Sequence, residues 1–409
     1  MNDEIVKYAV GIDLGTENVR AVVGSVGKDG KVSVIGYNEG KNAGMRKGVP
    51  VNLAGPAEQI DAMLKEVERM SGYEVKSGVI SVNGVQVSTA KVEGMIAVGT
   101  AEHEVNAEDM ARVEEVSVAG RVPANREILD VIPLEYVLDG VGGLRDPRGM
   151  KGSRLEMKAS VVSALSQNTE NVRRAAVAAE VQPTRLVPSV VAAARAVLSE
   201  RQMENGVAVV DIGATTTGVA VFEGGYLQYV GVVPVGSNNI SNDLAILLEV
   251  GIETAEEIKQ RFVTAGFDAE KDVTIKVDRE EMVFPREKVD AVVRDRLDDI
   301  FDKVRKELKK AGYDRRLPEG IILTGGGAKM KDIVIYAKSV LEAAVKIGVP
   351  KDLGGVSEAV SRPEYAATVG LMLMSAEGAA EAAGARAKAK KSSGKVGSGI
   401  LGFLKRIKF

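Results

Sequence analysis

The chain has 409 residues, of which 45% are hydrophobic and 27% charged, and it contains no cysteine. This length exceeds what one hydrophobic core supports and predicts two large domains, while the missing cysteines exclude disulfides and thiolate metal sites and fit a reducing cytosol. The acidic N-terminus lacks the apolar core of a signal peptide, and no apolar run reaches the ~20 residues that cross a bilayer.

The net charge of -3 conceals an asymmetry along the chain. Residues 385–409 hold eight of the 54 basic side chains and no acidic one, so the rest carries 46 basic against 57 acidic side chains. A basic end on an acidic body predicts an anionic partner for that end. Nucleic acid fits this pattern poorly, because aromatic residues make up only 4% of the chain and the body shows no basic stretch.

One pattern occurs twice, first in "YAVGIDLGTENVRAVVGSV" and again in "GVAVVDIGATTTGVAVFEGG". Each copy predicts an apolar strand, an Asp-(Leu/Ile)-Gly step, a short polar turn and a second strand, and a third strand follows in both cases. Amphipathic helices come after each strand triplet. The sequence therefore predicts an α/β architecture in two related halves, each with a mixed sheet.

Two segments with a different residue pattern interrupt these halves. The pattern of residues 87–165 predicts an inserted α+β subdomain of short strands and one helix. Asn106 is the predicted N-cap of that helix, and Asp109 follows three positions later. His103 lies between acids just before that helix and is predicted to be a solvated loop residue. Residues 254–317 are predicted to be helical and highly charged.

The chain then returns to the second half with "GIILTGGGAKMKDIVIYAKSV". Residues 376–396 are rich in Ala, Gly, Lys and Ser, which predicts a flexible linker. Residues 397–409 follow as a predicted terminal helix.

Three glycine turns, "DLGTEN", "DIGATTT" and "TGGGAK", each follow an apolar strand. Glycine lets backbone amides approach a phosphate, and hydroxyl side chains add donors. Any one of these turns could be an ordinary hairpin, but their order and the duplication favour a clamp around a nucleotide. Asp13 and Asp211, each at the end of a strand, would then hold Mg²⁺ indirectly, through water molecules bound to the ion.

This order of turns resembles the actin-like ATPase superfamily, and nearly the whole chain resembles the FtsA family of bacterial cell-division proteins. The most specific stretch is "REILDVIPLEYVLDGVGGLRDPRGMKGSRLE". The resemblance implies a two-lobed actin-like (ribonuclease H-like) α/β fold with an FtsA-type inserted α+β subdomain and a C-terminal amphipathic helix. The implied parts are 1–86 with 166–205 (lobe 1 core, 1A), 87–165 (insert 1C), 206–253 with 318–375 (lobe 2 core, 2A), 254–317 (insert 2B), the linker 376–396 and the helix 397–409.

The resemblance also assigns residues to bound ATP and Mg²⁺. The phosphates would be lined by Gly15, Thr16 and Asn18 of the first turn and by Gly213, Ala214, Thr215 and Thr216 of the second. Glu256 and Lys259 would meet the ribose, and Gly325, Gly326 and Lys329 would border the adenine.

Some residues depart from the family pattern. Ala214 and Thr215 replace glycines and narrow the approach to the phosphates, and Glu17 would repel phosphate if it pointed inward. Val187 stands near the place where active ATPases of the superfamily often have a polar or acidic side chain that orients water. We therefore expect ATP binding with weak or negligible hydrolysis.

Two partner contacts are also expected. Residues of the second insert would receive the C-terminal peptide of FtsZ, the tubulin-like division polymer, with Arg296 facing that acidic peptide. In the tail, Ile400, Phe403, Leu404 and Ile407 share one helix face, which fits reversible binding in the plane of an anionic membrane as well as docking on the chain's own domain. The residues assigned to the membrane are Ile400, Leu401, Phe403, Leu404, Lys405, Arg406, Ile407 and Lys408.

The family resemblance implies an ATP-binding, filament-forming protein on the inner face of the cytoplasmic membrane at the division site. It would tether the FtsZ ring there and recruit later division proteins. Three alternatives stay open from the residues alone: a PilM-like pilus-assembly adaptor of the same fold, a sugar or metabolite kinase, and a chaperone ATPase. The missing peptide-binding domain counts against the chaperone.

Overall fold

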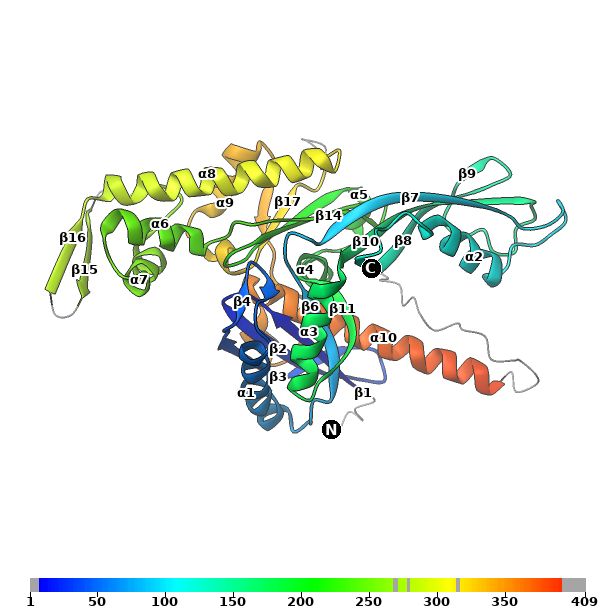
Figure 1. Cartoon of the computed structure of the whole chain (residues 1–409), viewed down its shortest axis with the longest axis horizontal. Coiled ribbons are helices and arrows are strands. Elements are labelled where there is room, and N and C mark those ends of the chain that lie inside the picture. The colour runs from blue at the N-terminus through cyan, green and yellow to red at the C-terminus, as the bar shows by residue number, and fades with distance from the viewer. Residues whose placement is uncertain (1–6, 268–270, 278–279, 314–316, 392–409) are drawn as a thin grey trace.

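The computed structural model describes residues 7–267, 271–277, 280–313 and 317–391 (Figure 1). The first strand triplet comprises β1 (Lys7–Leu14), β2 (Asn18–Val26) and β3 (Val32–Lys41), paired antiparallel in sequence order. Further strands complete a six-stranded sheet in the order β11-β6-β1-β2-β3-β19, where β6 is Ser77–Val82, β11 is Gln182–Pro188 and β19 is Gly354–Gly355. Nearby lie α1 (Ala54–Ser71), α3 (Ser166–Ala178) and the short pair β4 (Met45–Arg46) and β5 (Val49–Pro50). We call this part lobe 1.

The second triplet repeats that arrangement in lobe 2. Here β12 (Val207–Ile212), β13 (Thr217–Glu223) and β14 (Tyr226–Val233) join β17 (Ile321–Thr324) and β18 (Val345–Ile347) in the order β14-β13-β12-β17-β18. The first strand of each triplet also has a parallel neighbour, β6 for β1 and β17 for β12. The predicted duplication and the two-lobed α/β fold are thus confirmed.

Two helices pack between the lobes, α4 (Ser189–Val197) and α10 (Ala366–Lys391). They cross closely because glycine stands at the contact: a Cβ on Gly370 would lie 1.7 Å from the carbonyl oxygen of Ala192. On its other side α4 meets lobe 2, where a Cβ on Gly218 would lie 2.8 Å from that of Val190. One continuous hydrophobic cluster therefore contains side chains of both sheets.

The first insert is a four-stranded antiparallel sheet in the order β7-β10-β8-β9, with α2 (Ala107–Val118) packed against it. Its strands are β7 (Ser88–Ala97), β8 (Arg126–Leu138), β9 (Val141–Leu144) and β10 (Arg154–Leu165). The predicted cap is confirmed, since Asn106 and Asp109 form a reciprocal capping box. His103 lies in the loop before α2 as predicted and is partly exposed, and its Nε2 also lies 2.8 Å from Oδ2 of the buried Asp109.

The second insert is less uniformly helical than predicted. It contains α7 (Ile252–Phe262) and the long α8 (Arg286–Lys310), but the hairpin of β15 (Val273–Val277) and β16 (Glu280–Phe284) lies between them. Val273, Ile275 and Phe284 are buried in the lobe 2 core, which explains why this charged stretch forms strands. The remaining helices are α5 (Glu200–Asn205), α6 (Asn238–Leu248), α9 (Ile333–Leu341) and the 3-10 turns η1 (Gly326–Lys329), η2 (Ser357–Val360) and η3 (Pro363–Tyr365).

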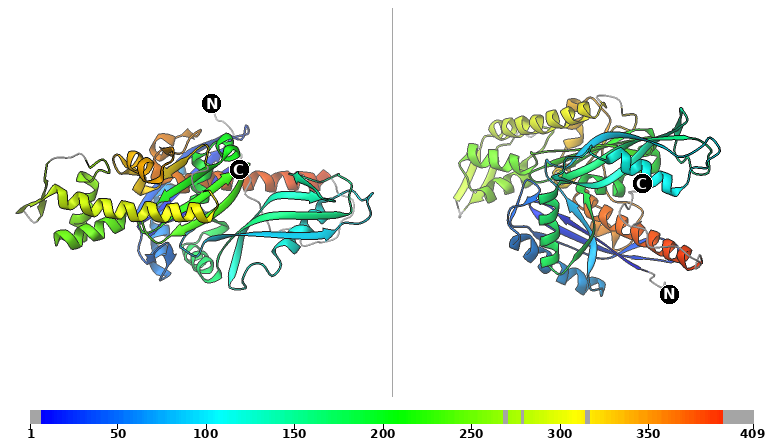
Figure 2. Two further views of the ribbon diagram at one scale, coloured as in Figure 1. Left: turned by 90° about the horizontal axis from the view of Figure 1, so that it is seen from above. Right: turned by 45° about the vertical axis from the view of Figure 1, so that its right-hand side comes forward.

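The linker prediction is wrong over most of its length, because α10 continues through Lys391 (Figure 2). Ala, Glu, Lys and Arg dominate this stretch and all have high helix propensity, which outweighs its few glycines. In the part of the chain that is described, no helix combines the length and apolarity needed to cross a bilayer. The terminal helix predicted over 397–409 lies outside the described residues. The other predicted domain boundaries stay a proposal.

Candidate functional site

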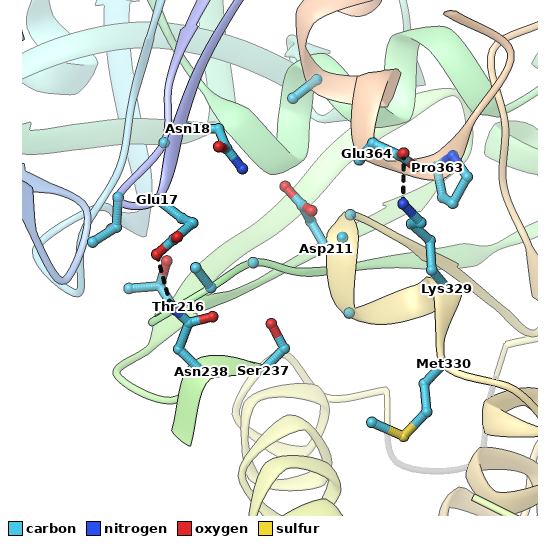
Figure 3. Close-up of a pocket in the computed structure, with 18 of the residues that line it drawn as sticks. Glu17, Asn18, Asp211, Thr216, Ser237, Asn238, Lys329, Met330, Pro363 and Glu364 are labelled. Atoms are coloured by element: carbon cyan, nitrogen blue, oxygen red, sulfur yellow. Dashed lines mark hydrogen bonds and ion pairs between the residues drawn. The ribbon is translucent and has the colours of Figure 1, made fainter. Parts of the chain in front are cut away.

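The three glycine turns meet at one cavity of about 1040 Å³ between the lobes (Figure 3). Thirteen of the residues predicted to contact ATP and Mg²⁺ line it: Asp13, Gly15, Thr16, Asn18, Asp211, Gly213, Ala214, Thr216, Glu256, Lys259, Gly325, Gly326 and Lys329. Thr215 does not line the cavity. The structure thus brings the predicted residues together, while their individual roles stay predictions.

Asp13 and Asp211 occupy equivalent positions in the two lobes, each one residue before the end of its strand. Ser189, at the start of α4, donates a hydrogen bond from Oγ to Oδ1 of Asp13 at 3.0 Å. Burial, and secondly the negative charge of Asp13, raise the pKa of the Asp211 carboxyl to about 7. Two carboxylates that repel each other in a cavity fit a divalent cation, whose charge would offset the repulsion.

The described residues contain no group of three or more His, Cys, Asp or Glu placed to hold a metal ion. Asp13 and Asp211 would therefore supply only part of a Mg²⁺ coordination shell. Water and substrate phosphates commonly fill the rest of such a shell. The cavity suits a metal that arrives with a nucleotide.

The first turn is held in place by Asn42, which the sequence did not indicate as a site residue. Asn42 donates from Nδ2 to the carbonyl of Gly15 at 2.6 Å and from its backbone N–H to the carbonyl of Glu17 at 2.8 Å. The N–H of Gly48 donates to Oγ1 of Thr16 at 3.0 Å. Ser189, Asn42 and Gly48 carry no motif of their own, because their contacts depend on segments that only the fold brings together.

The second turn contacts the first directly. Thr215 donates from Oγ1 to Oγ1 of Thr16 at 2.9 Å, across the two lobes. The Thr215 hydroxyl is thus engaged with Thr16, while Thr215 itself is not among the residues that line the cavity, contrary to its predicted place there. Gly236 packs so closely behind the turn that an added Cβ would lie 2.5 Å from the carbonyl oxygen of Gly213.

Glu17 lines the cavity, where its negative charge could repel a phosphate, but its carboxylate is already paired with two side chains. Lys41 Nζ lies 2.5 Å from Oε1, and Asn238 in lobe 2 donates to Oε2 at 2.9 Å. The hydrogen bond from Lys41 holds the pKa of the Glu17 carboxyl below its ordinary value, against the opposing effect of burial. Repulsion of a phosphate is therefore weakened, and Glu17 adds a second bond between the lobes.

The predicted ribose pair lies on α7. Lys259 Nζ is 2.6 Å from Oε2 of Glu256, and Ser241 donates to the same oxygen at 2.5 Å. Lys259 also donates to the carbonyl of Ser237 at 3.3 Å. These bonds hold both side chains at the cavity wall, one helical turn apart.

The third turn requires glycine, because Gly325 has φ +83° and an added Cβ would lie 2.3 Å from Oδ1 of Asp211. The turn is tied to η3, since both the N–H of Gly325 and the hydroxyl of Thr324 donate to the carbonyl of Pro363, at 3.0 and 2.9 Å. Lys329 forms an ion pair with Glu364 at 3.0 Å. Figure 3 shows Lys329, Pro363 and Glu364 on the opposite side of Asp211 from Glu17.

Val187 is fully buried at the end of β11, so this position offers no polar group to the cavity. Arg296 lies on α8, where its guanidinium bonds to Asp243 at 2.7 Å and to Asp299 at 2.9 Å. The hydrogen bond that Arg296 donates to Asp243 raises the pKa of the guanidinium. Its charge is thus already balanced by two carboxylates, and an acidic peptide would compete with them.

The structure resembles several solved proteins. A structure titled "PilM-PilN type IV pilus biogenesis complex" matches with a TM-score of 0.65 and 16% identity, over 90% of this chain and 98% of that one. MreB5 of Spiroplasma citri bound to ADP matches with a TM-score of 0.53 and 13% identity, over 95% and 99% of the two chains. At these identities the likeness shows a shared actin-like fold.

Sequence comparison gives the family. A family model for cell division protein FtsA matches residues 208–370, and a model for the SHS2 domain inserted in FtsA matches residues 84–163. Cell division protein FtsA of Pseudomonas aeruginosa is 34% identical over 90% of this chain and 89% of its own length. For FtsA of Bacillus subtilis the identity is 31%, over 89% and 82%. The chain belongs to the FtsA family of cell division proteins.

Proposed function

We propose that this protein binds ATP with Mg²⁺ between its lobes, forms filaments, and tethers FtsZ to the inner face of the cytoplasmic membrane, where it recruits later division proteins. The observation that carries the proposal is the cavity between two copies of one strand unit, with Asp13 and Asp211 in equivalent places. MreB5, which shares the fold, has been solved with ADP.

Asp13 and Asp211 would hold the Mg²⁺ ion, and the backbone of the glycine turns would face the phosphates. The bound ion would supply charge neutralisation at the phosphates. Ser189 keeps Asp13 oriented, while Glu17 and Thr16 connect lobe 1 to lobe 2 at the same end of the cavity. Nucleotide binding would favour one relative position of the lobes, and fast turnover is not expected because Val187 offers no group to orient water.

Membrane binding would come from the tail. The sequence predicts four large apolar side chains on one helix face, flanked by Lys405, Arg406 and Lys408, which would favour in-plane binding to anionic lipid. Many copies in a filament would strengthen the attachment through avidity. The same filament would present Arg296 and its neighbours to the C-terminal peptide of FtsZ.

Co-sedimentation with liposomes of varied anionic content, with and without MgATP, tests the proposal. The full chain should sediment with anionic liposomes, and a chain lacking residues 397–409 should stay in the supernatant. Phe403→Asp should behave like the deletion, while Val396→Asp, outside the predicted helix, should still bind. Membrane binding that survives the deletion would contradict the assigned anchor. Failure of the full chain to bind ATP in calorimetric titration would contradict the nucleotide role.

A further inference from the structure

Helix α10 continues beyond the body against which it packs. Its first half contacts α4 and strands of the lobe 1 sheet, and Arg195 of α4 donates from Nε to Oε1 of Glu377 at 2.8 Å. One residue later, a Cβ on Gly378 would meet no atom within 4 Å. The helix nevertheless runs on to Lys391, and Figure 1 and the right-hand view of Figure 2 show its last turns leading away from the lobe 1 sheet. We call residues 378–391 the extension.

The composition of the extension fits neither a core helix nor a lipid-binding one. After Met374 the helix contains no large apolar residue, so the extension has little to bury in protein or in lipid. The tail that follows is different, since it holds Ile400, Leu401, Phe403, Leu404 and Ile407. Alanine with interspersed Glu, Lys and Arg is the composition of semi-rigid helical spacers.

The packed half of α10 stabilises the extension as a helix. An isolated helix of this length would be marginal in water, because its first turn is costly to form. In α10 that first turn already exists, so each further residue only prolongs it. The basic residues Arg386, Lys388, Lys390 and Lys391 fall in the last two turns, where positive charge favours the negative end of the helix dipole.

We propose that the extension is a rigid spacer that holds the two lobes at a set distance from the membrane. This inference rests on the proposed membrane anchor at residues 397–409 and adds the element that fixes the height of the body above it. At about 1.5 Å per residue, residues 378–391 span about 20 Å.

The charge of the body gives this distance a physical consequence. Residues 1–384 carry 46 basic against 57 acidic side chains, a net charge of -11, so an anionic lipid surface repels the body while it attracts the basic tail. The Debye length is about 8 Å at physiological ionic strength. A spacer of about 20 Å exceeds two Debye lengths, which leaves the attraction of the tail in place and screens most of the repulsion of the body.

The distance from the body to the end of the extension tests the proposal without lipid. The chain contains no cysteine, so two introduced ones, Lys31→Cys in the turn after β2 and Lys390→Cys in the extension, are the only sites for spin labels. Double electron–electron resonance on the full chain should give one narrow distance distribution. Ala383→Pro should broaden it, because proline breaks the helix, and Ala383→Gln is the matched control that should leave it narrow. A wild-type distribution as broad as that of Ala383→Pro would overturn the spacer.

Energy transfer to acceptor lipids tests the height on the membrane. A fluorophore on Lys31→Cys is used with the full chain on vesicles of phosphatidylglycerol and phosphatidylcholine. Insertion of Glu-Ala-Ala-Ala-Lys-Ala-Ala after Ala383 adds about 10 Å of helix and should lower the transfer. Seven Gly and Ser residues at the same place should lower it less, because a coil lengthens only with the square root of its residue number.

The outcomes separate the spacer from the anchor on which it rests. Vesicle binding with equal transfer for the two insertions would overturn the spacer and leave the anchor standing. Ala383→Pro should still bind vesicles, since the tail is unchanged. Failure of the wild-type chain to bind vesicles would overturn the anchor itself, even with a narrow distance distribution in solution.

Discussion

Asp13 and Asp211 show how one residue type acquires two environments in a duplicated unit. Asp13 accepts a hydrogen bond from Ser189, whereas burial and the charge of Asp13 raise the pKa of Asp211 to about 7. The equivalent strand positions place both at the cavity, but among the described residues a hydroxyl donates to Asp13 and none donates to Asp211. The pair is therefore asymmetric before any ligand binds.

Asp211→Asn should weaken MgATP binding at least tenfold, because one of the two carboxylates that face the Mg²⁺ ion loses its charge. Binding of ATP measured in EDTA should weaken much less or become tighter, since the variant also removes a negative charge from the cavity. Asp61→Asn, on the exposed face of α1, is the control and should bind both forms like the wild type. Equal losses with and without Mg²⁺ would argue against a metal role for Asp211.

At the scale of elements, the close crossing of α4 and α10 depends on a glycine, Gly370, at the point of contact. Gly370 lies where an added Cβ would be 1.7 Å from the carbonyl oxygen of Ala192. Gly378, two helical turns on in α10, has nothing within 4 Å of the same position. The same substitution therefore has opposite consequences at the two glycines.

Gly370→Ala should lower the free energy of unfolding by about 1–3 kcal/mol or more, because the two helices must move apart. Gly378→Ala should raise it by up to about 1 kcal/mol through helix propensity. Urea denaturation of both variants measures the difference. A similar effect of the two substitutions would show that the crossing tolerates a Cβ.

A second junction joins the first insert to the edge of lobe 2. In the edge strand β14, the N–H of Val230 donates to Oγ1 of Thr89 in β7 at 2.7 Å. Lys91, also in β7, donates from Nζ to the side-chain oxygen of Gln228 in β14 at 2.8 Å. Partial burial lowers the pKa of Lys91 to about 8, against the opposing charge of Glu223. The insert thus protects a strand edge that would otherwise be open to pairing with other chains.

This lowered pKa predicts a pH dependence of stability. Between pH 8 and the ordinary lysine pKa of 10.5, the unfolded chain holds a proton on Lys91 that the folded chain has released. The free energy of unfolding contributed by this group should therefore rise with pH across that window. Lys91→Met should remove that contribution, and Lys65→Met, on exposed α1, should not. Denaturation series at pH 8 and pH 10 compare the variants, and an identical pH response in wild type and Lys91→Met would refute the assignment.

At the scale of the molecule, the lobes share one hydrophobic cluster. It includes Ile12 and Ile80 of lobe 1 together with Phe222 and Leu227 of lobe 2. The sheet of lobe 2 has its other face in a separate cluster, and the first insert has its own core. The shared cluster couples the unfolding of the two lobes.

Phe222→Ala removes a fully buried ring from that cluster and should cost about 3–5 kcal/mol. Because the cluster is shared, hydrogen exchange should accelerate in β1 of lobe 1 as well as in β12 of lobe 2. Met157→Ala, in the core of the first insert, should accelerate exchange mainly in the insert strands. Faster exchange confined to lobe 2 after Phe222→Ala would mean that the lobes unfold independently.

The sequence by itself determined the features that depend on short stretches of chain. The two strand triplets, the Asp-Gly turns at their ends and the capping box of Asn106 and Asp109 are local patterns of hydrophobicity, glycine and hydrogen-bonding side chains. The convergence of the glycine turns on one cavity could also be predicted, since the duplication places equivalent strand ends on facing lobes.

Only the tertiary structure decided the features in which distant side chains meet. It paired Thr215 with Thr16, gave Glu17 the partners Lys41 and Asn238, and placed Asp243 and Asp299 beside Arg296. Each outcome depends on which groups far apart in sequence come within hydrogen-bond distance, and no local pattern of residues encodes that distance.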